Sequence, residues 1–93
     1  MESAGRKDET TENKRKRLIF RSGHRGTKEM DIILGTFATK NVPYFSEDEL
    51  TDYDDLLCHN DPDLYNWITE KESPPDEVAN MPVFKKLMSH ESV

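Results

Sequence analysis

Apolar residues between positions 27 and 41 recur with the period of an α-helix, and this stripe constrains the fold more than any other feature of the sequence. Its members stand at i, i+3, i+4, i+7 and i+8: Met30, Ile33, Leu34, Phe37 and Ala38. We expect a helix over 27–41, with Thr27 as its N-cap and Pro43 just beyond its end. Gly35 inside this helix costs about 1 kcal/mol relative to alanine, so we expect another helix to cross closely there.

Shorter helical segments surround this stripe. Ser46 with Glu49 has the capping-box pattern, and Asp61 before Pro62 is typical of an N-cap followed by proline at the first helical position. Pro82 interrupts a further apolar stripe, so we expect the last helix to begin there. The remaining helices are predicted at about 14–20, 47–58, 62–69 and 82–89. Without strand-like alternation, these signals predict an all-α fold, a small bundle of five helices.

Composition limits the size of the core. The chain has 93 residues, of which 33% are hydrophobic and 34% are charged. A domain of this size buries only about 60–65% of its unfolded surface, so a large enclosed active-site cavity is not expected. We predict a single helical domain over 13–91 after a disordered tail over 1–12. Four aromatic side chains are assigned to its core: Phe37, Tyr65, Trp67 and Phe84.

The sequence carries no signal for secretion or for a membrane. Cys58 is the single cysteine, so no internal disulfide can form. The longest strictly apolar runs have three residues, and the N-terminus carries charges of both signs without an apolar segment. We expect a monomer that works in the cytoplasm of a bacterium, or in the mitochondrial matrix of a eukaryote.

Charge is distributed unevenly along the chain. Residues 1–40 carry ten Lys and Arg against six Asp and Glu, a balance of +4, whereas residues 41–93 carry three against thirteen, a balance of −10. Opposite charges on the two halves would orient the protein as it approaches a partner, or the charged residues simply keep the protein soluble. The basic run over 14–17 is short, has no aromatic residues between its charges and belongs to an acidic chain, so we do not expect nucleic-acid binding.

Charged and glycine residues gather at the turn before the 27–41 helix. They are Arg21, His24, Arg25, Gly26, Glu29 and Asp31. Guanidinium forks and backbone N–H groups on an exposed corner would bind carboxylate or phosphate groups of a partner or cofactor. An ordinary capped helix with an Arg25–Glu29 ion pair, worth about 0.3–0.5 kcal/mol, explains the same residues. The residue types alone favour neither reading.

Metal and nucleotide chemistry find little support in the sequence. Cys58 and His59 are adjacent, but His24 and His90 lie far from them along the chain. We favour a packing role for Cys58 and a helix C-terminal cation for His59 over a metal site. No P-loop, dinucleotide fingerprint or nucleophile elbow is present.

Three motifs together resemble a known family. They are R-G-x-x-E-x-D over 25–31, L-G-x-F over 34–37 and D-P-D-L-Y-x-W over 61–67. The first alone is weak, but the three in this order resemble the succinate dehydrogenase assembly factor 2 family over about residues 14–88. The resemblance implies a five-helix bundle, which agrees with the fold predicted above.

The resemblance also implies a function. Such proteins bind the flavoprotein subunit of succinate dehydrogenase, or in some bacteria of fumarate reductase, and promote covalent attachment of FAD to a histidine of that subunit. It implies a helper that is not itself an enzyme and that holds no cofactor stably. By position, the partner-binding turn falls on Arg25, Gly26 and Glu29, with Asp31 as a helper residue. An antitoxin-like or regulatory interaction module is the alternative function.

Overall fold

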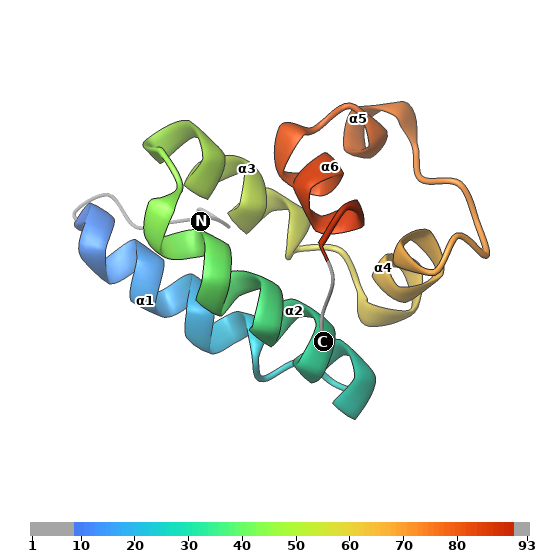
Figure 1. The fold of residues 1–93 in the computed structure, drawn as a ribbon, viewed down its shortest axis with the longest axis horizontal. Helices are drawn as coiled ribbons and strands as arrows, with labels where there is room; N and C mark the ends of the chain where they lie inside the picture. The colour runs from blue at the N-terminus through green and yellow to red at the C-terminus, as the bar shows by residue number, and fades with distance from the viewer. Residues whose placement is uncertain (1–8, 91–93) are drawn as a thin grey trace.

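The computed structural model describes residues 9–90 as an assembly of short helices, with no strand in this range (Figure 1). The elements are α1 (Thr11–Ser22), α2 (Lys28–Asn41), the 3₁₀ turn η1 (Val42–Tyr44), α3 (Glu47–Leu56), α4 (Asp61–Ile68), α5 (Asp76–Ala79) and α6 (Pro82–Met88). The predicted all-α class is confirmed, with five helices of seven or more residues and the single-turn α5. Within this range no helix is long and apolar enough to cross a membrane.

The first helix begins earlier than the sequence predicts. Thr10 is its N-cap, and the Thr10 hydroxyl accepts a hydrogen bond from the backbone N–H of Asn13 at 3.1 Å. Glu9 is also ordered, because its carboxylate accepts two hydrogen bonds from Arg17, at 2.7 and 3.1 Å. The tail predicted over 1–12 is therefore wrong for residues 9–12, while its first eight residues, and residue 91 of the predicted domain, lie outside the described residues.

Helices α1 and α2 pack side by side in opposite directions, and two glycines form their closest approach (Figure 1). A Cβ atom built on Gly35 would lie 3.3 Å from the Cα atom of Gly23. The contact confirms that Gly35 accommodates a crossing helix. The crossing matters for the site because Gly23 opens the turn that joins the two helices.

The core fills the space between the α1–α2 pair and the remaining helices. Phe37, Phe45 and Tyr53 form a cluster of rings whose centroids lie 5.7–6.1 Å apart. The Tyr53 hydroxyl lies 2.6 Å from the buried Ser22 hydroxyl, and burial raises the pKa of Tyr53 to about 12. The core assignment of Phe37, Trp67 and Phe84 is confirmed, whereas Tyr65 is half-buried at its edge.

Local capping signals place the starts of α2, α3 and α6 where the sequence predicts them. Ser46 and Glu49 form the reciprocal capping box at the start of α3. Thr27 caps α2 by accepting a hydrogen bond from the N–H of Met30 at 3.2 Å. Pro82 stands in the first turn of α6 and separates it from α5, as a residue without a backbone N–H must.

Replacing Gly35 with leucine is predicted to separate α1 from α2. The new side chain would meet the Gly23 backbone, which cannot rotate away, and such overpacking typically costs about 1–3 kcal/mol. Urea unfolding followed by circular dichroism measures the loss. Lys40→Leu is the control, because Lys40 is exposed on the same helix. Equal stability of the two variants would contradict the close crossing.

Candidate functional site

The six predicted site residues lie together around the turn between α1 and α2. Arg21 stands in the last turn of α1, His24, Arg25 and Gly26 form the turn between the helices, and Glu29 and Asp31 stand in the first turn of α2. The residues differ in exposure: His24, Gly26 and Glu29 are exposed, whereas Arg25 and Asp31 are at least partly buried. The turn therefore has an inner and an outer face.

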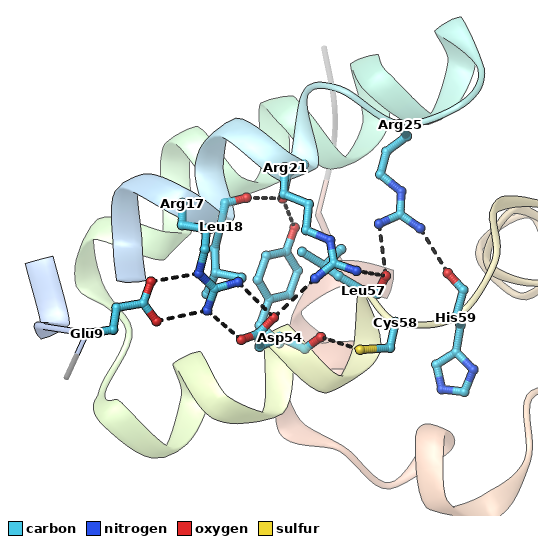
Figure 2. A network of polar contacts seen from close by, with 11 residues as sticks. Glu9, Arg17, Leu18, Arg21, Arg25, Asp54, Leu57, Cys58 and His59 are labelled. Carbon is cyan, nitrogen blue, oxygen red and sulfur yellow. Dashed lines mark hydrogen bonds and ion pairs between the residues drawn. The ribbon is translucent and has the colours of Figure 1, made fainter. Parts of the chain in front are cut away.

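Arg25 belongs to the inner face. Its side chain is only 9% exposed and bridges to the segment between α3 and α4. Nε donates to Asp61 Oδ1 at 2.8 Å. The two terminal nitrogens donate to the carbonyl oxygens of Leu57 and His59, each at 2.9 Å (Figure 2). Of the two readings that the sequence left open, the free guanidinium fork does not hold for Arg25, because the carbonyls near the end of α3 and the Asp61 carboxylate offer this buried cation the partners it requires.

Gly26 is held by the same carboxylate. Asp61 Oδ2 accepts a hydrogen bond from the Gly26 N–H at 2.6 Å, and the Asp31 carboxylate accepts one from the Arg25 N–H. A Cβ atom at position 26 would lie 2.9 Å from Asp61 Oδ2, so a side chain there would displace the carboxylate. Glycine suits this position because the turn backbone approaches the Asp61 carboxylate closely, and the outer side of Gly26 stays open to solvent.

Asp61 carries this contact because it is not the helix cap. The sequence predicts Asp61 as the N-cap of the helix, but Asn60 is the N-cap, and its side chain accepts from the Asp63 N–H at 2.9 Å. The shift by one residue leaves both Asp61 oxygens free to bind the α1–α2 turn. Burial raises the pKa of Asp61, but the hydrogen bonds from Arg25 and Gly26 outweigh it and the net pKa is lowered.

Arginines four residues apart continue the inner face along α1. Arg17 and Arg21 both reach Asp54 of α3, whose side chain is fully buried (Figure 2). The Arg17–Asp54 distance is 2.7 Å, and the hydrogen bonds that Arg17 donates to the carboxylates of Glu9 and Asp54 raise the pKa of Arg17. Arg21 also donates to the Leu57 carbonyl at 3.2 Å. Much of the basic charge that the sequence places near the corner therefore fastens α1 to α3.

The outer face presents an aromatic pair beside a shallow basin. His24 stacks on Phe20 with ring centroids 4.0 Å apart, and Phe20 is 65% exposed. The basin is lined by Arg21, His24, Arg25, Gly26, Leu57, Cys58, His59, Asn60 and Asp61. The expected packing role of Cys58 is wrong, since Cys58 is exposed, and His59 sets its ring edge-on to Trp67 at 5.1 Å. Within residues 9–90 no three His, Cys, Asp or Glu side chains cluster as a metal site.

Comparison with known proteins identifies the family of the chain. A family model described as the flavinator of succinate dehydrogenase matches residues 16–91. The mitochondrial succinate dehydrogenase assembly factor 2 of Dictyostelium discoideum is 46% identical over 79 residues, which are 85% of this chain and 55% of that protein. The chain belongs to this family. The range matched by the family model thus includes the whole α1–α2 turn and the residues around Asp31 and Asp61 that hold it.

Other relatives agree with the assignment. The assembly factor 2 of Arabidopsis thaliana is 41% identical over 85 residues, 88% of this chain and 44% of that protein. The one of Saccharomyces cerevisiae is 44% identical over 85 residues, 88% of this chain and 52% of that protein. This assembly-factor chain spans about half the length of these curated relatives.

Sequence reasoning missed Asp54 of the inner face, and it assigned Asp61 the wrong role. A signal for Asp54 exists, because it stands four residues after Leu50 and next to Tyr53, on the inward stripe of its helix. An acid on such a stripe needs a cation, and Arg17 and Arg21 are spaced to reach one carboxylate. No comparable local signal distinguishes Asp61 from Asn60 as the cap.

Asp61→Asn is predicted to destabilise the chain by about 1.5–3 kcal/mol at pH 7, because the hydrogen bonds from Arg25 and Gly26 lose their charged acceptor. A pKa lowered by folding stabilises the native state above the unfolded pKa, and this contribution is lost as the pH falls through the folded pKa. The difference from wild type should therefore shrink as the pH falls below about 4. Urea unfolding between pH 7 and pH 3 measures it.

The control for this titration is Asp48→Asn, at an exposed carboxylate in the first turn of α3. It should change stability by about 0.5 kcal/mol or less. A destabilisation by Asp61→Asn that stays constant over the whole pH range would contradict a role for the charge.

Proposed function

We propose that the chain binds the flavoprotein subunit of succinate dehydrogenase and promotes covalent attachment of FAD to it. The match of the flavinator family to residues 16–91 carries this proposal. The structure supports it through the turn, which is fixed from inside by Asp61 and Asp31 yet exposes Gly26 and Glu29. A surface that is already ordered loses little entropy when it docks on a partner.

The chain would act as a helper that is not itself an enzyme. The bond would form between the flavin 8α carbon and a ring nitrogen of a histidine in the flavoprotein. The 8α methyl group and the histidine each give up a proton, and the flavin ring takes up the electron pair and is left reduced, so all reacting atoms lie outside this chain. Such a reaction requires the two atoms to be held about 3–3.5 Å apart in the right orientation. A rigid turn pressed against the flavoprotein near its flavin would hold that geometry. We propose no stable FAD site on this chain, which acts on the FAD of its partner.

The roles of the six predicted residues divide under this proposal. Gly26, Glu29 and His24 would touch the partner, since they are exposed. Arg25 and Asp31 would shape the turn from behind, through their contacts to Asp61 and to the turn backbone. Arg21 is intermediate, with a side chain 36% exposed and bonded to Asp54.

The site of action follows from the partner. The relatives are named as mitochondrial proteins. We propose that the chain works as a monomer in the compartment where the flavoprotein matures, which is the mitochondrial matrix in a eukaryote and the cytoplasm in a bacterium.

Reconstitution tests the function directly. Apo-flavoprotein is mixed with FAD, with and without the chain, and covalent flavin is read as in-gel fluorescence after denaturation. The chain should raise the rate of covalent attachment at least tenfold, because it lowers the cost of aligning the reacting atoms. Glu47→Gln, at an exposed residue of α3 away from the turn, should match wild type. Equal yields with and without the chain would refute the proposal.

Gly26→Ala is predicted to reduce attachment several-fold while the chain stays folded. The added methyl group would displace the Asp61 carboxylate and shift the outer face of the turn. The measurement is the initial rate of covalent flavin formation, with thermal unfolding checked alongside. Gly23→Ala is the matched control, because its Cβ would meet nothing closer than 3.9 Å. Equal rates for the two alanine variants would show that the shape of the turn is not used.

A further inference from the structure

A groove on the other side of Asp61 has no role so far. It runs between the first turn of α2 and the first turn of α4, which lie near each other in Figure 1. The lining residues are Thr27, Glu29, Met30, Asp61, Pro62 and Tyr65, and the volume is about 310 Å³. Pockets that enclose drug-sized ligands and cofactors measure about 300–1,000 Å³. This space is at the lower end of that range, so it suits one long side chain better than a dinucleotide.

The groove is apolar on its walls and negative at its rim. Met30, Pro62 and the half-buried ring of Tyr65 form the apolar part. Glu29 is exposed and takes part in none of the ion pairs among residues 9–90, whereas Asp61 is already bound to Arg25 and Gly26. None of the described lining residues is basic. The negative charge of Glu29 therefore faces the groove without an ion-pair partner among residues 9–90.

These features select the chemistry of an occupant. A side chain that fits must be apolar along its stem and cationic at its end, as lysine and arginine are. Arginine fits better, because its planar guanidinium binds a carboxylate through two hydrogen bonds and also stacks on an aromatic ring. Tyr65 already accepts a cation from its own chain, since Lys71 Nζ lies 5.5 Å from the ring centroid and Lys71 does not line the groove.

We propose that the groove between α2 and α4 receives an arginine side chain of the flavoprotein subunit, with its guanidinium on Glu29 and its stem between Met30, Pro62 and Tyr65. This inference rests on the proposed function, because it names one contact of the same docking surface. Asp61 links the groove to the docking turn, since it fixes the turn on one side and forms a wall of the groove on the other.

Photo-crosslinking locates the occupant. The full chain carries p-benzoylphenylalanine at position 65, or at position 62 if the first variant does not bind, and is irradiated in complex with the flavoprotein. The crosslinked flavoprotein peptide should contain an arginine within a few residues of the attachment point. The control is the same group at position 44, where Tyr44 is 85% exposed in η1. A complex that forms without a crosslink from the groove, or a peptide without arginine, would overturn the inference.

Charge exchange then tests the pairing. Glu29→Gln should weaken binding to the flavoprotein about tenfold, and Glu29→Arg about a hundredfold or more, while Glu47→Gln has no effect. Changing the crosslinked arginine of the flavoprotein to glutamate should restore binding of Glu29→Arg to within about tenfold of wild type. Failure of that rescue would overturn the pairing.

The two proposals fail differently. If the wild-type chain neither binds the flavoprotein nor raises the yield of covalent flavin, the proposed function is wrong, and the groove inference falls with it. If binding and flavin attachment are normal but Glu29→Arg binds as wild type does, the function stands and the groove inference is wrong.

Discussion

The contact between Arg25 and Asp61 is the one on which the arrangement of the site depends. The two side chains are 9% and 14% exposed and join residues 36 positions apart, so they tie the α1–α2 pair to the start of α4. A buried ion pair offsets its desolvation only when its remaining hydrogen-bonding groups are satisfied. Here the two terminal nitrogens of Arg25 donate hydrogen bonds to the carbonyl oxygens of Leu57 and His59, and the second oxygen of Asp61 accepts one from the Gly26 N–H. Each partner is therefore costly to remove alone.

This arrangement explains how a chain with a small core can offer a defined surface. The turn over 23–27 would otherwise be a short glycine-containing loop with several accessible conformations. Three groups fix it instead: the glycine contact between α1 and α2, the Asp31 carboxylate and the Asp61 carboxylate. The ordering is completed inside the protein, so docking on a partner need not supply it. A helper whose task is orientation benefits from this rigidity more than from reactive side chains.

The parts of the structure that follow from local rules were predictable from the sequence. Thr27, the Ser46–Glu49 pair and Pro82 act on backbone groups within about four residues, and each stands where it was predicted. Gly35 was informative because it breaks a local rule, and the broken rule pointed correctly to a close crossing.

The partners of the arginines could not be read from the sequence in this way. Arg25 looked like a free surface cation because its acceptors lie more than thirty residues away, and one of them depends on whether Asn60 or Asp61 caps α4. Cap preference hardly distinguishes asparagine from aspartate, so that choice is decided by tertiary contacts. The start of α1 was misplaced although its cap, Thr10, is a local signal. Long-range contacts explain only the ordering of Glu9, which is held by Arg17, as Arg17 is by Asp54.

The uneven charge of the sequence acquires its meaning from these contacts. Arg17, Arg21 and Arg25 of the basic half are paired with Asp54 and Asp61 of the acidic half, so much of the apparent polarity is neutralised within the molecule. The chain still carries a net charge of −6, so acidic side chains outside these pairs must outnumber the remaining basic ones. A partner that docks at the turn thus meets the exposed carboxylate of Glu29 beside the exposed ammonium of Lys28. The corner whose residue types suggested the binding of anions therefore presents, once folded, a negative charge as well as positive ones.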